Sequence, residues 1–389
     1  RLLIGPLHVT HPMLKFVIKQ LLHDKANTFI TVLALSASIA VIVVLQGFEQ
    51  GQYEQLKLAS INRGSDLIAV QSKVNNFMAT RSVIPQLARE QIEAVPGVKA
   101  AHPLTTLPVI YRHKSMQTPI SLIVFDTAGG PSNLLAGEAK NRGQGIVIDR
   151  SLAKKYDLSI GDEFIVANFA FSISGITSEA AFMTPFAFIN YDGLIDFFLD
   201  SDIASDLSTF PLVSFLLIET DPKAPLEKIR QTIEGEVTSV DLFTLSEMAK
   251  NDVKLGQGFY KPILGLLVSV GFLLGSLLIG LLMFSAAHRQ QRDFAVMLAL
   301  GFKAHHLFGF TLCLSSVLLL LSAVLGLLLA DFIGHLIESA RPVYYFAVFH
   351  PQVLTKAGII VGLFALLGAV APYGLIRKSD PITALHRAS

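Results

Sequence analysis

Charged side chains are scarce in this sequence of 389 residues, of which only 16% are Asp, Glu, Lys or Arg. Soluble domains carry about a quarter charged residues. The deficit is local, because four windows contain no Asp, Glu, Lys, Arg or His: residues 26–48, 262–287, 307–330 and 357–376. A helix of about 20 residues crosses the hydrocarbon core of a bilayer. The sequence therefore predicts four membrane-spanning helices.

Cysteine is nearly absent as well. The one cysteine, Cys313, lies within the third window, so the chain cannot form an internal disulfide, and we expect this thiol to contribute to packing. No Asp, Glu, Lys or Arg interrupts the four windows, which argues against an ion or proton relay inside the membrane. The net charge of +1 gives no reason to expect a nucleic-acid partner.

Motifs for catalysis and phosphate binding are missing too. The sequence contains no G-x-x-x-x-G-K-[ST], H-E-x-x-H, G-x-S-x-G or paired C-x-x-C. The stretch "GQGFYK" at 256–261 has the wrong glycine spacing for a phosphate loop. His305 and His306 are adjacent, so both cannot easily bind one metal ion from one helix face. We therefore expect no enzyme activity, no cofactor and no metal site in this chain, and any ATP hydrolysis must take place on another polypeptide.

Lysine and arginine outnumber acidic residues in three short segments, 1–25, 288–306 and 377–389, which four spans would place on one side of the membrane. The loop 331–356 is balanced. Because positively charged short segments stay in the cytoplasm, we expect both termini there and region 49–261 in the periplasm of a multi-pass inner (cytoplasmic) membrane protein. The first window is too long for the apolar core of a cleavable signal, so we expect an uncleaved signal anchor.

The region 49–261 alternates strand-like and helical patterns, which predicts a large α+β extracytoplasmic domain inserted between the first two spans. We expect strands over 98–112 and 163–176, and a helical stalk over 244–262. Whether the domain splits into two subdomains stays open. The full expected order is a cytoplasmic amphipathic helix (1–25), the first span (26–48), the periplasmic domain (49–261), the second span (262–287), a cytoplasmic coupling helix (288–306), the third span (307–330), an outer loop (331–356), the fourth span (357–376) and a cytoplasmic tail (377–389).

Small residues lie four positions apart in three of the spans, including Ser36 and Ala40 in the first. Gly271 and Gly275 do so in the second span, and Gly358 and Gly362 in the fourth. Small residues let membrane helices approach closely, so this spacing predicts helix contacts. The alternative is that glycine is simply common in membrane helices.

The segment 288–301 combines an apolar helical face with charged flanks and ends at a glycine that suits a helix stop. The face consists of Phe294, Met297, Leu298 and Gly301, and the flank of Arg289, Arg292 and Asp293. As a short amphipathic element between two spans, it could move those spans if a soluble partner bound it. The alternative is a plain connector at the membrane surface.

The same segment resembles a known family. "RDFAVMLALGF" (292–302) is similar to the R-E-[IYF]-[GA]-x-[LM]-x-A-[LM]-G signature of MacB/FtsX-like (type VII) ABC transporter permeases, closest to the DevC/HrtB-like branch. Asp293 replaces the usual Glu and keeps its charge, and Leu298 replaces a frequent Lys or Arg. "GIVIDRSLAKKYDLSIGDEFIVANFAFSISGI" (145–176) resembles the outer-domain core, and "RKSDPITALH" (377–386) resembles the family's C-terminal element.

The resemblance implies a homodimeric permease of an ABC exporter, with a separate ATPase that binds ATP and Mg and contacts the residues of 289–301. The pair would act by mechanotransmission and expel a hydrophobic or amphiphilic substrate, such as a glycolipid, haem or a drug, from the outer leaflet or the periplasm. Membrane lipid would surround the spans. A DevC-like assembly would add a periplasmic adaptor and an outer-membrane duct, whereas an HrtB-like pair would act alone.

The substrate site and the class of function leave alternatives open. Gln46 and Glu49, at the outer end of the first span, could frame an opening for an amphiphile in a homodimer, or Glu49 could be an ordinary interfacial carboxylate. Lipoprotein release is an alternative within the transporter class. From other classes come an FtsX-like relay to periplasmic cell-wall hydrolases and a membrane receptor that needs no ATPase.

Overall fold

The computed structural model describes residues 17–19, 21–78, 81–85, 87–139, 143–200, 212–289 and 304–378. The chain divides into two compact units. The membrane unit comprises residues 1–50, 262–336 and 346–389, and the sheet domain comprises residues 51–261 and 337–345.

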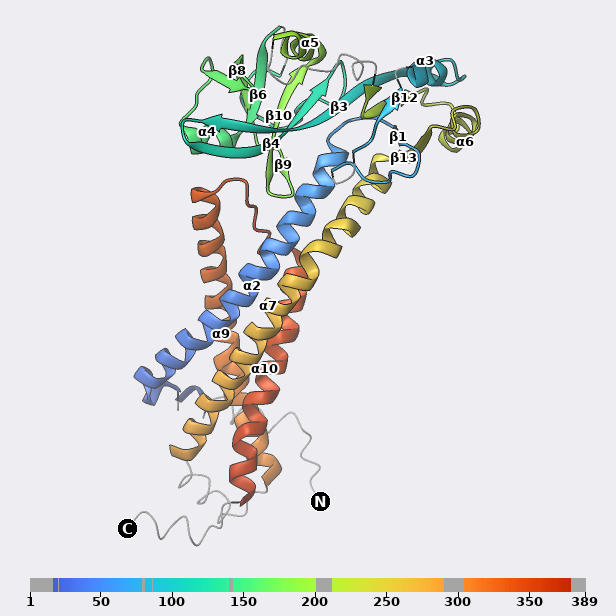
Figure 1. Cartoon of the computed structure of the whole chain (residues 1–389). Coiled ribbons are helices and arrows are strands. Elements are labelled where there is room, and N and C mark those ends of the chain that lie inside the picture. The colour runs from blue at the N-terminus through green and yellow to red at the C-terminus, as the bar shows by residue number, and fades with distance from the viewer. Residues whose placement is uncertain are drawn as a thin grey trace, which may run out of the picture. The chain divides into compact units, whose positions relative to one another are not determined.

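Within the described residues, four helices are long and apolar enough to cross a membrane. They are α2 (Lys25–Ile61), α7 (Leu245–Arg289), α9 (Ala304–Ala340) and α10 (Pro351–Lys378) (Figure 1). Because a large α/β region lies between the first and second of them along the chain, the fold class predicted from the sequence is confirmed.

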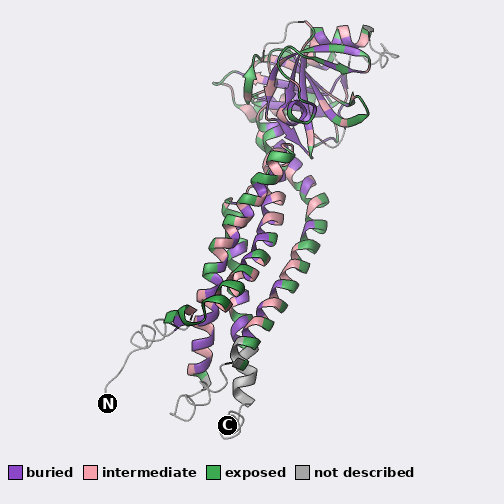
Figure 2. Ribbon diagram, turned by 90° about the vertical axis from the view of Figure 1, so that its left-hand side faces the viewer, coloured by how far each residue is buried: buried purple, intermediate pink, exposed green. Residues whose placement is uncertain are grey.

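Apolar side chains from all four helices form the core of the membrane unit, and they include Leu35, Ile42, Ile279, Leu318 and Phe364. Other apolar side chains on these helices stay exposed, as the mixed colouring along each helix shows (Figure 2). Exposed leucines are expected where a helix faces lipid, because hydrocarbon is no less apolar than a protein core.

The spaced glycines behave differently in the two spans. A Cβ at Gly271 would lie 3.3 Å from Ile42 Cγ1, and one at Gly275 would lie 2.6 Å from Phe364 Cζ, so close packing is confirmed in α7. A Cβ at Gly358 or Gly362 would meet no atom within 4 Å in the described chain. No helix contact therefore explains the second pair among the described residues.

The sheet domain is built on a large mixed sheet with the strand order β13-β1-β12-β3-β4-β10-β6-β8-β5, while β7 pairs with β8, β9 pairs with β10, and β2 pairs separately with β11. The strands are β1 (Leu67–Gln71), β2 (Ile84–Pro85), β3 (Val98–His113), β4 (Met116–Phe125), β5 (Leu134–Gly137), β6 (Gly145–Asp149), β7 (Glu163–Val166), β8 (Phe169–Thr177), β9 (Ala180–Ala181), β10 (Thr184–Asn190), β11 (Leu212–Val213), β12 (Phe215–Thr220) and β13 (Val240–Thr244). The helices are α3 (Leu87–Glu93), α4 (Arg150–Tyr156), α5 (Tyr191–Asp200) and α6 (Leu226–Glu236).

Three apolar clusters stabilise this domain, whose strands are mostly buried (Figure 2). One cluster includes Ile92 of α3 and Ile233 of α6, and a second includes Tyr156 of α4 and Phe197 of α5. The third joins sheet residues such as Phe215 to the part of α2 and α7 within the domain. The first part of β3 pairs with β12, and the second part pairs with β4. β3 therefore joins the strands packed against α3 and α6 to those packed against α4 and α5 in one continuous sheet.

The strand character expected over 163–176 is confirmed, but a turn divides the stretch into two strands. The structure has the hairpin β7–β8, whose loop residues Ala167 and Asn168 take φ values of 48° and 64°. Asn is one of the few residues with a side chain that adopts this conformation readily, and a two-residue loop with positive φ matches the twist of a hairpin. The continuous apolar pattern of the stretch concealed the turn.

Candidate functional site

The predicted coupling residues Arg292, Asp293, Phe294, Met297, Leu298 and Gly301 lie outside the described residues. Arg289 is the last residue of α7. Their role in binding an ATPase therefore stays a prediction.

The predicted substrate residues Gln46 and Glu49 both lie on α2. Gln46 is only 5% exposed, and Glu49 is half-buried. Between them, Gly47 accepts a hydrogen bond at 2.9 Å from the backbone N–H of Ala347, and the ring of Phe48 lies 5.4 Å from that of Phe346. This part of α2 thus packs on the segment before α10, and the cavities described below are lined by other residues.

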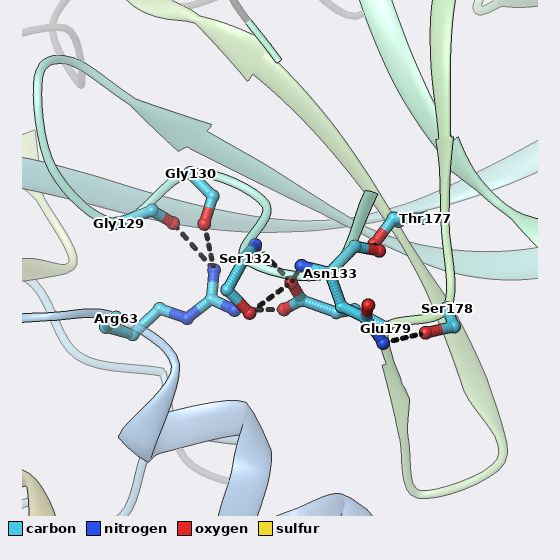
Figure 3. Close-up of polar contacts among 8 residues, drawn as sticks. All are labelled: Arg63, Gly129, Gly130, Ser132, Asn133, Thr177, Ser178 and Glu179. Carbon is cyan, nitrogen blue, oxygen red and sulfur yellow. Dashed lines mark hydrogen bonds and ion pairs between the residues drawn. The ribbon is translucent and has the colours of Figure 1, made fainter. Parts of the chain in front are cut away.

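A buried ion pair lies just beyond the end of α2. Arg63 and Glu179 are 1% and 6% exposed, and Arg63 Nη2 contacts Glu179 Oε2 (Figure 3). Arg63 Nη1 donates to the carbonyl oxygen of Gly129 at 2.6 Å, and its guanidinium lies 5.3 Å from the centre of the Phe188 ring. We call this arrangement the clasp.

Ser132 satisfies the other oxygen of the clasp carboxylate. Glu179 Oε1 accepts hydrogen bonds from the N–H of Ser132 at 2.6 Å and from its hydroxyl at 3.0 Å (Figure 3). Gly129 has φ of 87°, a conformation that favours glycine. Arg63 Nε is buried with no hydrogen-bond partner among the described residues. Because removing one partner of a buried ion pair leaves an uncompensated charge, the clasp favours one arrangement of the chain after α2.

A second buried carboxylate ties α2 to α7 within the sheet domain. Asp252 of α7 accepts a hydrogen bond from Ser60 Oγ at 2.8 Å and from the N–H of Phe77 at 3.0 Å. It is fully buried. Burial raises the pKa of Asp252 to about 6, against the opposing effect of these donors.

The start of α7 is fixed by a capping box. The N–H of Glu247 donates to Thr244 Oγ1 at 3.2 Å, and the N–H of Thr244 donates to Glu247 Oε2 at 2.9 Å. This reciprocal pair satisfies two backbone donors that a helix start otherwise leaves free. Since Thr244 also ends β13, strand and helix join with no intervening loop.

The sheet domain contains several cavities. A mixed cavity of about 180 Å³ lies beside the clasp, and its lining includes Asn133, Arg150 and Glu179. A second mixed cavity of about 330 Å³ is lined by Arg81, Asp126 and other residues. A third, of about 750 Å³, is apolar. Each is large enough to hold water or a small ligand.

Sequence reasoning missed the clasp, the Ser60–Asp252 bond and the apolar cavity. Arg63 is separated from Glu179 by 116 positions, and Ser60 from Asp252 by 192. Asp252 offered one signal, because it falls on the same helical face as Met248 and Ala249, which are both buried. A charge at a core position of an amphipathic helix indicates a buried partner.

Comparisons with known proteins agree with this architecture. A family model described as the MacB-like periplasmic core domain matches residues 28–236, and one described as the FtsX-like permease C-terminal region matches residues 265–381. An uncharacterised ABC transporter permease of Mycobacterium bovis is 22% identical over 351 residues, which cover 89% of this chain and 94% of that protein. One from Mycobacterium tuberculosis is 22% identical over 377 residues, which cover 96% and 99%.

Two solved structures match about half of this chain. The periplasmic region of MacB from Actinobacillus actinomycetemcomitans gives a TM-score of 0.36 at 9% identity, and the match covers 50% of this chain and 94% of that one. The extracellular domain of the noncanonic ABC-type transporter YknZ from Gram-positive bacteria gives 0.34 at 11% identity, with coverage of 46% and 100%.

Proposed function

This chain belongs to the family of ABC transporter permeases with a MacB-like periplasmic core domain and an FtsX-like C-terminal region, and from that premise we propose that it exports a hydrophobic or amphiphilic substrate. An ABC transporter permease implies an ATPase partner. The substrate would leave from the outer leaflet or the periplasm, and two copies of the chain would form the permease.

The observation that carries the proposal is the continuity of α2 and α7. Each runs unbroken from a charge-free window into the sheet domain. At the end of α2 stands the clasp, α7 starts at its capping box, and Ser60 and Asp252 join the two helices. Rigid elements with fixed ends transmit displacement rather than absorb it. This is the property that a mechanically driven exporter needs.

The ATPase would act from the cytoplasmic end. We propose that Arg289, Arg292, Asp293, Phe294, Met297, Leu298 and Gly301 form the surface that it binds, with ATP and Mg held by the ATPase itself. Both termini would then be cytoplasmic, and the sheet domain would lie in the periplasm, bounded by the inner membrane. Gln46 and Glu49 stay proposed as the rim of an outer-leaflet opening. A periplasmic adaptor and an outer-membrane duct would complete an adaptor-dependent version.

Co-purification of the full chain from its native membrane tests this function. We expect an ATP-hydrolysing subunit in the eluate, an at least tenfold loss of it with Arg292→Glu, and its retention with the control Arg292→Lys, because reversing a charge at an interface opposes binding. An eluate without an ATPase, or one that Arg292→Glu leaves unchanged, contradicts the proposal. A cell-wall hydrolase bound to the sheet domain would instead support a relay function.

A further inference from the structure

One cavity of the sheet domain is an apolar groove of about 750 Å³. Two of its walls are the β9–β10 turn, with Phe182 and Met183, and α7, with Phe259 and Tyr260. The strands β3 and β4 form the third wall, with Pro108, Val109, Ile110, Pro119, Ile120 and Ser121.

The β9–β10 turn has an unfavourable backbone. Phe182 and Met183 form a two-residue hairpin loop with φ values of 50° and 57°. Asn-Gly normally occupies such loops, because positive φ is costly for a residue with a large side chain. Core packing does not account for Met183, which is 42% exposed. Backbone strain of this kind concentrates at ligand-binding sites, where the surrounding structure holds it in place.

Aromatic contacts hold this turn against α7. The ring centre of Phe182 lies 6.3 Å from that of Phe259 and 6.1 Å from that of Tyr260. Phe259 nevertheless stays 60% exposed, and Ile110, in the β3 wall, is 53% exposed. Large apolar side chains therefore line an open groove at a free-energy cost that an apolar ligand would remove.

The side chains that line the groove indicate which kind of ligand it can bind. Among the described residues that line the groove, none is charged, and the side-chain polar groups are the hydroxyls of Ser121, Thr184 and Tyr260. An aliphatic chain needs no polar partner, and the volume lies within the range of about 300–1,000 Å³ usual for small-molecule sites. Pro108 and Pro119 lack backbone N–H groups, which disfavours addition of a strand from a protein partner.

The residues that follow the α7 wall in the sequence include a positive charge and the start of a membrane-spanning window. Lys261, which is exposed, directly follows Tyr260 and offers a cation to an anionic head group. At Pro262 the second charge-free window begins. The groove-lining residues Phe259 and Tyr260 therefore directly precede Lys261 and this window along the chain.

We propose that this groove binds the aliphatic chain of an anionic amphiphile drawn from the outer leaflet, with the Phe182–Met183 turn as one wall and Lys261 beside the head group. The inference rests on the proposed export function, because it names the class of substrate and a place where that substrate binds outside the membrane. Binding itself needs no ATPase, so the two proposals fail separately.

The absence of tryptophan from the chain allows a direct test. Ile110→Trp places a single indole in the groove, and Ile165→Trp is its matched control, since Ile165 is a strand isoleucine that is 45% exposed and lies outside the lining. The full-length chain in nanodiscs is titrated with a brominated long-chain fatty acid, whose bromine quenches indole fluorescence. We expect saturable quenching at position 110 and only weak, linear quenching at position 165.

Blocking variants then test the walls. In the Ile110→Trp background, Met183→Asp and Phe259→Asp should each weaken the apparent affinity at least tenfold, because each puts a charge beside the chain. Leu135→Asp, at a residue that is 53% exposed outside the groove, should leave it unchanged. Lys261→Gln should weaken binding of the fatty acid but not of the matching brominated alcohol.

Two results would contradict the proposed ligand site. One is equal quenching of the indoles at positions 110 and 165, and the other is an unchanged affinity for the fatty acid in both aspartate variants. Saturable quenching in a chain that recruits no ATPase would support ligand binding in the groove and contradict the export function. Recruitment of an ATPase without saturable quenching would support the export function and contradict ligand binding in the groove.

Discussion

Replacing Asp252 by asparagine should make the sheet domain more stable near neutral pH. Burial raises the pKa of Asp252 from 3.8 to about 6, so the folded state binds this proton more tightly than the unfolded state does. The contribution of the protonated group is fully present below about pH 4 and is lost as the pH rises through about 6. The shift of about two units corresponds to about 3 kcal/mol, at about 1.4 kcal/mol per unit.

Asparagine can keep the hydrogen bonds of the site. Its carbonyl oxygen can accept from the N–H of Phe77, and its amide can donate to the hydroxyl of Ser60, without a charge at any pH. Asp252→Asn should therefore match the wild type near pH 4 and exceed its free energy of unfolding by up to about 3 kcal/mol near pH 8. Ser60→Ala is the contrasting variant, because it removes a donor to the ionised form and should steepen the loss of stability with pH.

Urea unfolding of the full chain in detergent micelles, followed by tyrosine fluorescence, measures these differences, because the chain has no tryptophan. The contribution of Asp149 to the free energy of unfolding is lost over the same pH range, because burial also raises the pKa of Asp149 to about 6. The single variant should thus remove only part of the pH dependence, and adding Asp149→Asn should remove a second part. A variant that keeps the full wild-type pH profile, or that is less stable than the wild type near pH 8, refutes the reasoning.

The remaining predictions concern the clasp, the strained turn and the helix packing. Arg63→Met should cost about 3 kcal/mol of unfolding free energy, because it leaves a buried carboxylate unpaired; the double variant with Glu179→Met should cost less than the sum of the single variants in a double-mutant cycle, and strict additivity would contradict the pairing. Met183→Gly should raise the thermal stability by about 1 kcal/mol by relieving positive φ while weakening chain binding in the quenching assay; a stability loss would show that the turn is not strained. Gly275→Leu should lower the yield of folded protein in membranes, because its Cβ would overlap the ring of Phe364 and overpacking costs about 1–3 kcal/mol. The control Gly358→Leu should leave the yield unchanged, because a Cβ there meets no atom within 4 Å in the described chain.

Local features of the fold could be predicted, and long-range ones could not. The spans are predictable because each charge-free window is a local feature of the sequence. The strand over 98–112, found as β3, was predictable from the strand-forming residues within the segment itself. The clasp depends on which loops the sheet order brings to the end of α2, and no neighbouring residue signals that. The Phe182–Met183 turn was hidden because its residues are the opposite of turn formers.

The joining of α2 and α7 to the sheet opposes sliding of one helix past the other within the sheet domain. After α2 the chain enters β1, and α7 leaves from β13, and these two strands pair antiparallel from Leu67 with Thr244 to Gln71 with Val240. Sliding one helix past the other within the sheet domain would break this ladder and the Ser60–Asp252 bond together. Each lost hydrogen bond that leaves a buried group unpaired costs about 1–3 kcal/mol. Within the sheet domain, the ends of the two helices and the adjoining strands therefore resist sliding past one another.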